Sequence, residues 1–296
     1  MSKEKKLMRS LMFVPANSLK YLNSSLESEA DVLILDIEDS VQPIENKQLA
    51  RDNIKSFLES GKFDKKSIFI RINDRESGEL LKDVMQLSLT GVKGFMYPKA
   101  KTAMDIYFFD KLLETVEYEK GIEKGTFKII PLIETTSSVL HVEEICLSSD
   151  RNIAVAYGSE DFIADLEGIH DYEHASLYTP RALIAMGARS AGIIPIDTVH
   201  IRVHDLEDLE KNLKVSKNLG FEGMLVLHPK ELKLVHKYFS PTQQEIDEAN
   251  EIIDLSKEAE SQGLGVAIKN GKFIGPPIIR RALKIISKHK LINHLK

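Results

Sequence analysis

The sequence of residues 128–161, KIIPLIETTSSVLHVEEICLSSDRNIAVAYGSED, contains two short apolar runs that each end in carboxylates. The first run, residues 129–133, stops at Glu134. The second, residues 153–158, is followed three positions later by Asp161. Runs this short and this apolar are typical of strands that are buried on both faces. The stretch therefore predicts two neighbouring strands of an α/β fold.

The segment between the two runs, residues 135–147, is predicted to form a helix with Thr136 as its N-cap. A strand–helix–strand unit places the C-terminal ends of both strands at the same edge of a parallel sheet. Glu134 and Asp161 are therefore expected to lie together at that edge. Mg²⁺ takes only one or two protein carboxylates and leaves its other positions to water and substrate. We predict that these two residues hold one Mg²⁺ or Mn²⁺ ion.

The chain has 296 residues, of which 43% are hydrophobic and 29% charged, as in an ordinary globular protein. Its net charge of −5 argues against a nucleic-acid-binding surface, and no apolar stretch is long enough to span a membrane. The apolar run 11–14 is too short for the core of a signal peptide. The single cysteine, Cys146, excludes an internal disulfide framework. We expect a cytoplasmic protein in which this thiol is buried.

Eight apolar runs with helical segments between them predict a TIM barrel, a closed ring of eight parallel strands. Residues 18–28 and 43–58 are two of the predicted helices. We expect the barrel to cover residues 1–240. The predicted strands are residues 11–14, 32–35, 68–70, 94–97, 129–133, 153–158, 198–201 and 223–227.

A charged C-terminal extension, residues 241–296, follows the barrel and is not expected to fold as a separate domain. Residues 241–262 are predicted to form an amphipathic helix that is capped by Ser240 and has Pro241 in its first turn. The remaining segments are an apolar piece with spaced glycines, a turn-rich loop and a second helix, at residues 263–267, 271–277 and 278–295.

Charged or metal-binding residues lie at, or within a few positions of, the ends of most predicted strands, on the face where TIM barrels place their chemistry. One such residue could simply mark where a strand leaves the core, but the whole set favours an active site. Asp36, Glu38 and Asp39 are close enough for mutual repulsion, so we expect some of them to hold metal-bound water or neighbouring cations. The set is Asp36, Arg71, Lys99, Glu134, Asp161, Arg202 and His228.

The histidines have structural interpretations that we prefer. His228 could act as a base, but a histidine before a proline at a strand end is as easily a hydrogen-bonded residue of the core. His170, Asp171 and His174 resemble a metal cluster, yet they belong to a polar segment and are predicted to lie at the surface.

Two carboxylates with a bound cation, together with Arg71 and Lys99, suit a reaction in which negative charge develops on oxygen. The metal would act as a Lewis acid, and the guanidinium would bind a substrate carboxylate through two parallel hydrogen bonds. Enolate formation, with carbon–carbon cleavage β to a carbonyl, is the natural candidate. The sequence has no pattern of a Ser-His-Asp hydrolase, a phosphate-binding glycine loop or a Cys/His zinc site.

Several short motifs occur together in the order and spacing of one family. Through them the chain resembles the citrate lyase β-subunit-like family, which includes the malyl-CoA and citramalyl-CoA lyases, from residue 9 to about residue 283. The motifs are RSLMFVPA (9–16), LDIEDSV (35–41), RIN (71–73), PK (98–99), PLIET (131–135), GSEDF (158–162) and HP (228–229).

The resemblance implies a TIM barrel in which Glu134 and Asp161 hold Mg²⁺ and Arg71 contacts the substrate oxygens, so these three form the predicted catalytic set. It implies cleavage, or formation, of a 3-hydroxyacyl thioester on coenzyme A or an acyl carrier protein, with an acyl thioester and an oxo acid as products. It also implies a homotrimer in which a C-terminal segment covers a neighbour's site, with other citrate-lyase-type subunits as potential partners. The residues assigned to the substrate and its thioester carrier are Arg71, Lys20, Pro98 and Lys99.

The C-terminal loop departs from the family pattern, which reads Gly-Lys-Met-Ile-Asp-x-Pro and supplies its Asp to the adjacent subunit as an acid/base group. Residues 271–277 read GKFIGPP, so Gly275 stands where that Asp belongs. A second departure is HIRVH (200–204), where many relatives have a tyrosine and an acidic or amide residue.

Three functions remain open at this point. Gly275 favours a non-catalytic subunit that binds an acyl thioester or serves in assembly. A metal-dependent acyl-CoA thioesterase would share the metal site and differ in that water attacks the thioester. The intact residues Arg71, Glu134 and Asp161 favour the lyase, because a decayed enzyme usually loses its metal ligands too. We therefore predict a Mg²⁺-dependent carbon–carbon lyase or aldolase.

Overall fold

A computed structural model describes residues 7–170, 174–264, 266–269 and 272–294. The chain divides into two compact units, one covering Met8–Val235 and the other containing His236–Lys296. The division falls close to the predicted end of the barrel at residue 240. The expectation that the C-terminal part does not fold by itself stays a prediction.

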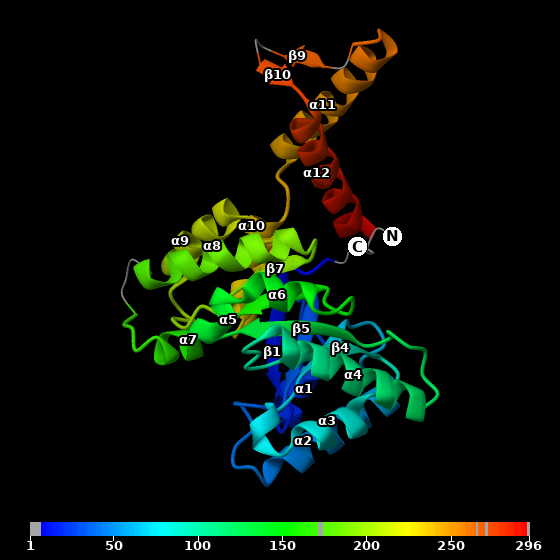
Figure 1. The fold of residues 1–296 in the computed structure, drawn as a ribbon, viewed down its shortest axis with the longest axis vertical. Helices are drawn as coiled ribbons and strands as arrows, with labels where there is room; N and C mark the ends of the chain where they lie inside the picture. Colours follow the sequence, from blue (N-terminus) through cyan, green and yellow to red (C-terminus); the bar gives the residue numbers. More distant parts are fainter. Residues whose placement is uncertain (1–6, 171–173, 265, 270–271, 295–296) are drawn as a thin grey trace. The chain divides into compact units, whose positions relative to one another are not determined.

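The first unit is a closed barrel of eight parallel strands, each paired with the next and β8 paired with β1 (Figure 1). Helices surround the ring of strands, so the predicted TIM barrel is confirmed. The strands are β1 (Ser10–Pro15), β2 (Val32–Asp36), β3 (Ile68–Arg71), β4 (Val92–Tyr97), β5 (Lys128–Ile133), β6 (Ala154–Tyr157), β7 (Ile194–Asp197) and β8 (Gly223–Val226).

The helices that follow the barrel strands come in this order along the chain, and the last of them, α10, continues past Val235 into the second unit. They are α1 (Leu19–Ser25), α2 (Asn46–Glu59), η1 (Arg75–Ser77), α3 (Leu80–Leu87), α4 (Ala103–Glu119), α5 (Thr136–Leu140), α6 (Val142–Leu147), α7 (Ser159–Asp165), α8 (Ala175–Ser190), α9 (Leu206–Leu219), η2 (Pro229–Glu231) and α10 (Leu232–Phe239).

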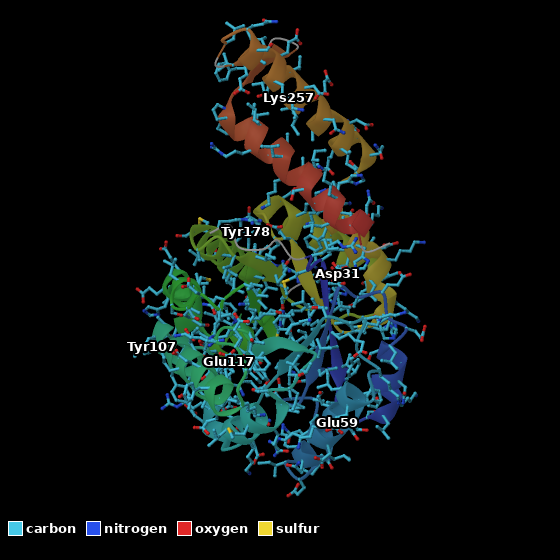
Figure 2. The ribbon with its side chains drawn as sticks, turned by 90° about the vertical axis from the view of Figure 1, so that its right-hand side faces the viewer. Asp31, Glu59, Tyr107, Glu117, Tyr178 and Lys257 are labelled. Carbon is cyan, nitrogen blue, oxygen red and sulfur yellow. The ribbon has the colours of Figure 1, made fainter. Side chains whose placement is uncertain are left out.

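The barrel is filled by side chains from the inner faces of the strands, including Leu11, Ile34, Phe69 and Ile130, which are at most 1% exposed. Buried ion pairs fix the outer layer. In one of them the Glu117 carboxylate receives two bonds from Arg151, at 2.6 and 2.7 Å. Figure 2 shows Glu117 among the side chains inside the barrel unit, whereas Tyr107 lies at its edge.

The seventh strand was predicted at the wrong place. The predicted strand 198–201 lies beyond β7, which ends at Asp197 and pairs with β6 and β8. Asp197 is fully buried, and its charge is compensated by an ion pair with Arg181 of α8, at 3.0 Å. A charged residue thus occupies a core position, and the alternating apolar residues after it belong to the following loop.

The helix predicted at residues 135–147 is two short helices, α5 and α6, that meet at His141. Its N-cap is Thr135, not Thr136. The reason is a reciprocal capping box, in which the Ser138 N–H donates to the Thr135 hydroxyl and the Thr135 N–H donates to the Ser138 hydroxyl. In the same region Cys146 is buried, as expected, and burial raises the pKa of its thiol to about 12.

Beyond α10, the described part of the C-terminal unit contains the helices α11 (Gln243–Ser261) and α12 (Pro276–His294) and a two-stranded hairpin of β9 (Ala267–Lys269) and β10 (Lys272–Ile274). The N-cap of α11 is Thr242, because its hydroxyl accepts a bond from the Glu245 N–H, so the predicted cap at Ser240 is wrong. The predicted loop 271–277 contains β10 and the first residues of α12, while its Gly271 lies outside the described residues.

Within the part of the chain that the structure describes, no helix is long and apolar enough to cross a membrane.

Candidate active site

Arg71 is the centre of an ion-pair cluster at the C-terminal ends of β2 and β3. Asp36 and Arg71 are the last residues of these strands and are partners in the strand register. The guanidinium contacts Asp36 at two points, with Nε 2.7 Å from Oδ1 and Nη2 2.7 Å from Oδ2. Its Nη1 lies 3.2 Å from Glu38 and 3.1 Å from Asp39. The predicted acidic triplet therefore surrounds this arginine.

Asp36 and Arg71 stabilise each other's charged form. Burial raises the pKa of Asp36, but the adjacent Arg71 charge outweighs this effect and the pKa is lowered overall. Burial likewise disfavours the charged form of Arg71, but Asp36, Glu38 and Asp39 outweigh it, so the pKa of the guanidinium is raised. The Phe13 ring lies 4.7 Å from the guanidinium carbon and covers one face of it. Arg71 is a permanent cation held in one orientation.

Lys99 links this cluster to the next strand. It follows β4 after the buried Pro98, and its backbone is in the left-handed region, with φ of 50°. In this conformation the Lys99 N–H donates to Oε1 of Glu134 at 2.5 Å. Its ammonium lies 3.2 Å from Glu38 and 3.3 Å from Asp74. One lysine thus contacts three carboxylates, two through its side chain and one through its backbone.

Glu134 follows β5 directly and is 2% exposed. Its pKa is raised well above the ordinary value, first by burial and then by the negative charges of Glu38 and Asp161. Burial also raises the pKa of Glu38 to about 7, although Arg71 and Lys99 oppose the effect. Asp161 is exposed on α7, the helix after β6. The site therefore gathers more carboxylate charge than its nearby cations balance.

This excess of negative charge fits a hard divalent cation, because carboxylates that raise one another's pKa are stabilised by a positive ion between them. Among the residues that the structure describes, no group of three or more His, Cys, Asp or Glu is arranged to hold a metal. The predicted pair of Glu134 and Asp161 would then supply two ligands and leave the remaining positions to water and substrate.

A family model described as HpcH/HpaI aldolase/citrate lyase matches residues 9–229. The chain belongs to this family. Citrate lyase subunit beta of Haemophilus influenzae is 32% identical over 285 residues, which cover 96% of this chain and 98% of that protein. L-malyl-CoA/beta-methylmalyl-CoA lyase of Rhodobacter capsulatus is 29% identical over 306 residues, covering 97% and 96%. The resemblance predicted from the motifs is confirmed.

A solved structure from M. tuberculosis, citrate lyase beta subunit complexed with oxaloacetate and magnesium, is 25% identical to this chain. The two structures align with a TM-score of 0.64, over 79% of this chain and 97% of that chain. A protein named as a citrate lyase beta subunit, with a fold similar to that of this chain, thus binds oxaloacetate and magnesium.

Other predicted residues lie outside the Arg71 and Glu134 cluster. Lys20 is exposed on α1. Arg202 lies five residues beyond the end of β7 and pairs with Asp208, at 3.1 Å, so it does not end a strand as predicted. His228 is half-buried and its Nδ1 accepts a bond from the Lys230 N–H at 3.1 Å, in keeping with the structural interpretation.

A second polar network is centred on Asp208 of α9 and has no counterpart among the predicted sites. The Asp208 carboxylate lies within 3.4 Å of His174, His200 and Arg202. His174 is therefore partly buried in a network instead of lying free at the surface, and Asp171 of the same predicted group lies outside the described residues. The sequence offers little signal for this network, because His174 lies at the start of α8, Asp208 lies on α9, and His200 and Arg202 lie between β7 and α9.

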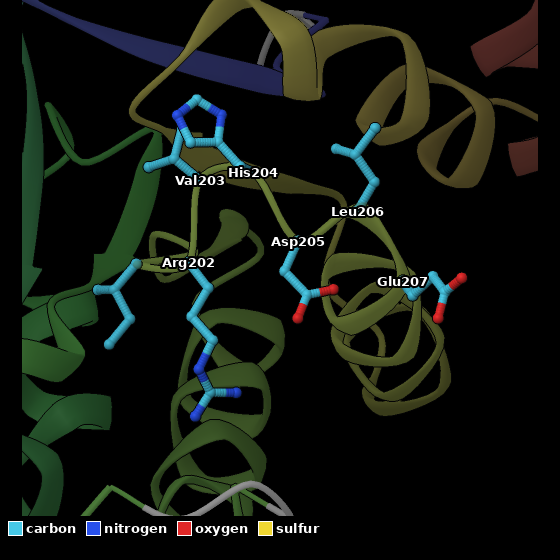
Figure 3. A pocket seen from close by; sticks show the side chains of 7 residues that line it. Arg202, Val203, His204, Asp205, Leu206 and Glu207 are labelled. Carbon is cyan, nitrogen blue, oxygen red and sulfur yellow. The ribbon is translucent and has the colours of Figure 1, made fainter.

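The loop between β7 and α9, together with the first two residues of α9, lines an open cavity of about 920 Å³ formed by residues 201–207. Figure 3 shows His204 and Leu206 on one side of this loop, with Arg202 and Asp205 on the other. The His204 ring lies edge-on to that of His228, with 5.9 Å between their centres. None of the three predicted catalytic residues, Arg71, Glu134 and Asp161, lines this cavity.

Proposed function

We propose that this protein is a cytoplasmic, Mg²⁺-dependent carbon–carbon lyase that cleaves, or forms, a 3-hydroxyacyl thioester to give an acyl thioester and an oxo acid. One observation carries the proposal. The buried Glu134 carboxylate lies close enough to Glu38 and Asp161 for their charges to raise its pKa, while Lys99 and the fixed cation Arg71 flank the same acidic cluster. The membership of the family, with relatives named as lyases, supports the reaction class.

The residues have distinct roles in this proposal. Glu134 and Asp161 would hold magnesium, which when bound supplies positive charge beside the oxygen on which negative charge develops. The Nη1 edge of Arg71 would bind a substrate oxygen, sharing or displacing the exposed Asp39. The Lys99 side chain, which is 40% exposed, would place its ammonium near the same charge from the end of the neighbouring strand β4. Asp36 and Glu38 would keep both cations in place.

In the proposed cleavage, the substrate hydroxyl loses its proton and becomes the carbonyl of the oxo acid. The electrons of the broken carbon–carbon bond pass to the carbon next to the thioester, which then takes up a proton. Gly275 carries no group for either proton transfer. The thioester carrier, coenzyme A or a carrier protein, would approach the face that bears Lys20, which is exposed on α1.

The metal assignment is tested by Glu134→Gln and Asp161→Asn, with Glu160→Gln as a control one position from Asp161 on the same helix. We expect both ligand variants to lose Mg²⁺ affinity in titration calorimetry and to lose cleavage activity, while the control keeps both. Removal of divalent cations with EDTA should abolish activity, and Mg²⁺ or Mn²⁺ should restore it. Unchanged Mg²⁺ affinity in the Glu134 variant would show that Glu134 is not a metal ligand.

A substrate panel distinguishes the lyase from its alternatives. Malyl- and citramalyl-type thioesters on coenzyme A and on a carrier protein are incubated with Mg²⁺, and oxo acid and free thiol are measured separately. A lyase releases oxo acid, whereas a thioesterase releases thiol. Binding of thioester without either product would favour the subunit that Gly275 suggests.

We also propose that the protein is a homotrimer in which the C-terminal hairpin covers a neighbouring subunit. Ile268 and Phe273 are cross-strand partners on the hairpin, and they are 72% and 61% exposed. Two large apolar side chains side by side in water are better accounted for as a contact surface. Sedimentation analysis tests the trimer, and a monomer would remove this part of the proposal. Other citrate-lyase-type subunits are the alternative partners.

A further inference from the structure

Glu134 and Gly158 lie side by side at the ends of β5 and β6. Ile133 and Tyr157, the residues before them, are register partners, and the Gly158 N–H donates to the carbonyl of Ile133 at 2.9 Å. A Cβ atom on Gly158 would lie 2.8 Å from Cβ of Glu134 and 2.8 Å from its Oε2. These distances are well inside the ordinary contact distance of non-bonded heavy atoms. The Glu134 side chain therefore occupies the space that any other residue at position 158 would need.

The backbone itself does not require glycine at this position. Gly158 has φ of −105° and ψ of 91°, an extended conformation that any residue can adopt. The need for glycine is therefore one of space and not of backbone freedom. Two atoms of Glu134 are in the way, and one of them, Cβ, is attached directly to the backbone, so it can move only if the strand moves.

The other oxygen of the same carboxylate is held by a second unusual backbone feature. Oε1 accepts the N–H of Lys99, whose positive φ is uncommon for a residue other than glycine. Residues held in such conformations cluster at functional sites, where the surrounding structure enforces them. The strands on either side of β5 thus fix the Glu134 carboxylate. The residue after β4 supplies a donor to Oε1, and Oε2 fills the space that a side chain at position 158, after β6, would need.

We propose that Gly158 is a positioning residue that lets the Glu134 carboxylate take the one orientation in which it binds a hard divalent cation. The inference rests on the proposed function, since it takes Glu134 as a metal ligand. A methyl group at position 158 would displace Oε2 of Glu134 from the place that it occupies in this structure. The loss should appear in metal affinity, with or without substrate.

The test is Gly158→Ala, with Mn²⁺ as the probe and its electron paramagnetic resonance signal as the measure of free ion. Groups that orient metal ligands typically affect affinity by roughly 10- to 100-fold, and we expect a weakening of this order. Gly168→Ala is the matched control, because a Cβ there would meet only the side-chain ends of Leu166 and Ile163, at 3.3 Å or more. Circular dichroism and thermal unfolding show whether each variant is folded.

Two further variants separate the possible failures. Glu134→Asp leaves Gly158 in place and shortens the carboxylate arm by one methylene, so it tests the need for orientation even if Gly158→Ala does not fold. In the Glu134→Gln background, Gly158→Ala should cause no additional loss, because its effect acts through that carboxylate.

Normal Mn²⁺ affinity in a folded Gly158→Ala protein, or in Glu134→Asp, would overturn the positioning role. Normal affinity in Glu134→Gln would instead overturn the metal site itself, and with it the proposed function. Weak binding in all three variants with a normal Gly168→Ala control is the expected result.

Discussion

Arg71 and Asp36 form a two-point ion pair between the last residues of two neighbouring strands, with both nitrogen–oxygen distances at 2.7 Å. Asp36 is 1% exposed, so the barrel itself fixes the pair. The paired edge of the guanidinium is therefore taken by the protein. Substrate can meet the Nη1 side of the guanidinium, but it can receive the parallel Nε and Nη2 bonds only by displacing Asp36.

Arg71→Lys should consequently impair both stability and catalysis. Lysine keeps the charge but loses one of the two bonds to buried Asp36, and hydrogen bonds to charged groups contribute about 1.5–3 kcal/mol each. We expect a fall of this order in the free energy of unfolding, measured with urea, together with a large loss in kcat/KM. Arg75→Lys is the control, because Arg75 is exposed. Normal stability and normal kinetics in Arg71→Lys would show that Arg71 is replaceable.

Lys47 should be needed to shape the acidic turn that surrounds Arg71. It is 4% exposed on α2, and its ammonium donates to the carbonyls of Ile37 and Glu38, at 2.9 and 2.6 Å. Lys47→Met removes both bonds while keeping much of the packing, so we expect a loss of about 2–4 kcal/mol in stability. Activity should fall as well, because the turn carries Glu38.

Lys55→Met provides the comparison for that variant. Lys55 lies on the same helix, but it is 30% exposed, and its contacts with Gln86 and Asp52 are to side chains and not to the backbone of the acidic turn. Its substitution should change the free energy of unfolding by less than about 1 kcal/mol. Equal effects of the two lysine substitutions would contradict a special role for Lys47.

His200 should make stability depend on pH. Burial lowers the pKa of this histidine, but Glu231 and Asp208 outweigh the effect, so the pKa is raised above 6.5. Its Nε2 lies 3.0 Å from Asp208 and its Nδ1 lies 3.8 Å from Glu231, while Arg202 and His174 also face Asp208. A raised pKa favours the charged form in the folded state. The stabilisation is therefore complete below pH 6.5 and is lost as the pH rises through the folded-state pKa.

His200→Gln measures this contribution. The difference in unfolding free energy between wild type and variant should be larger at pH 6 than at pH 9, because only the protonated imidazole pairs with the two carboxylates. Arg202 stays charged over this range and serves as an internal reference for the network. A difference that is the same at both pH values would mean that His200 is neutral in the folded protein.

The strand ends of the barrel could be predicted from sequence because the strands are buried on both faces and therefore read as apolar runs. β7 could not, since its last residue is Asp197, whose charge is compensated by Arg181 on a helix 16 positions earlier in the chain. Pairing of that kind is invisible until the helix is placed. The hairpin of β9 and β10 was missed because its strands have three residues each.

The identities of the site residues were suggested by their types and positions, but the contacts between them depend on backbone geometry. Nothing in the sequence shows that Lys99 adopts a positive φ and turns its N–H toward Glu134. The two-point pairing of Arg71 with Asp36 requires the register of β2 and β3, which side-chain patterns leave open. Sequence patterns therefore located the site, and the fold determined its hydrogen bonds.

We expect that restoring the missing acid takes two substitutions, because the residues at the end of β10 are packed together. Gly275 is buried, and a Cβ atom there would lie 2.7 Å from the ring of Phe273. The family pattern has Met at the position of Phe273 and Asp at the position of Gly275, so the two departures belong together. Gly275→Asp alone has to displace the ring, whereas Met is unbranched and flexible and can make room.

If the chain is a lyase slowed by the lost acid, Phe273→Met with Gly275→Asp should raise cleavage of malyl- or citramalyl-type thioesters more than Gly275→Asp alone. General acid–base groups typically contribute roughly a hundredfold or more to the rate, so the gain should be plain in an oxo-acid assay. Phe273→Met alone controls for the change in packing and should leave the rate as it is. No gain from the double variant, with the fold and Mg²⁺ binding intact, would mean that this protein acts on a different substrate or binds thioesters without cleaving them.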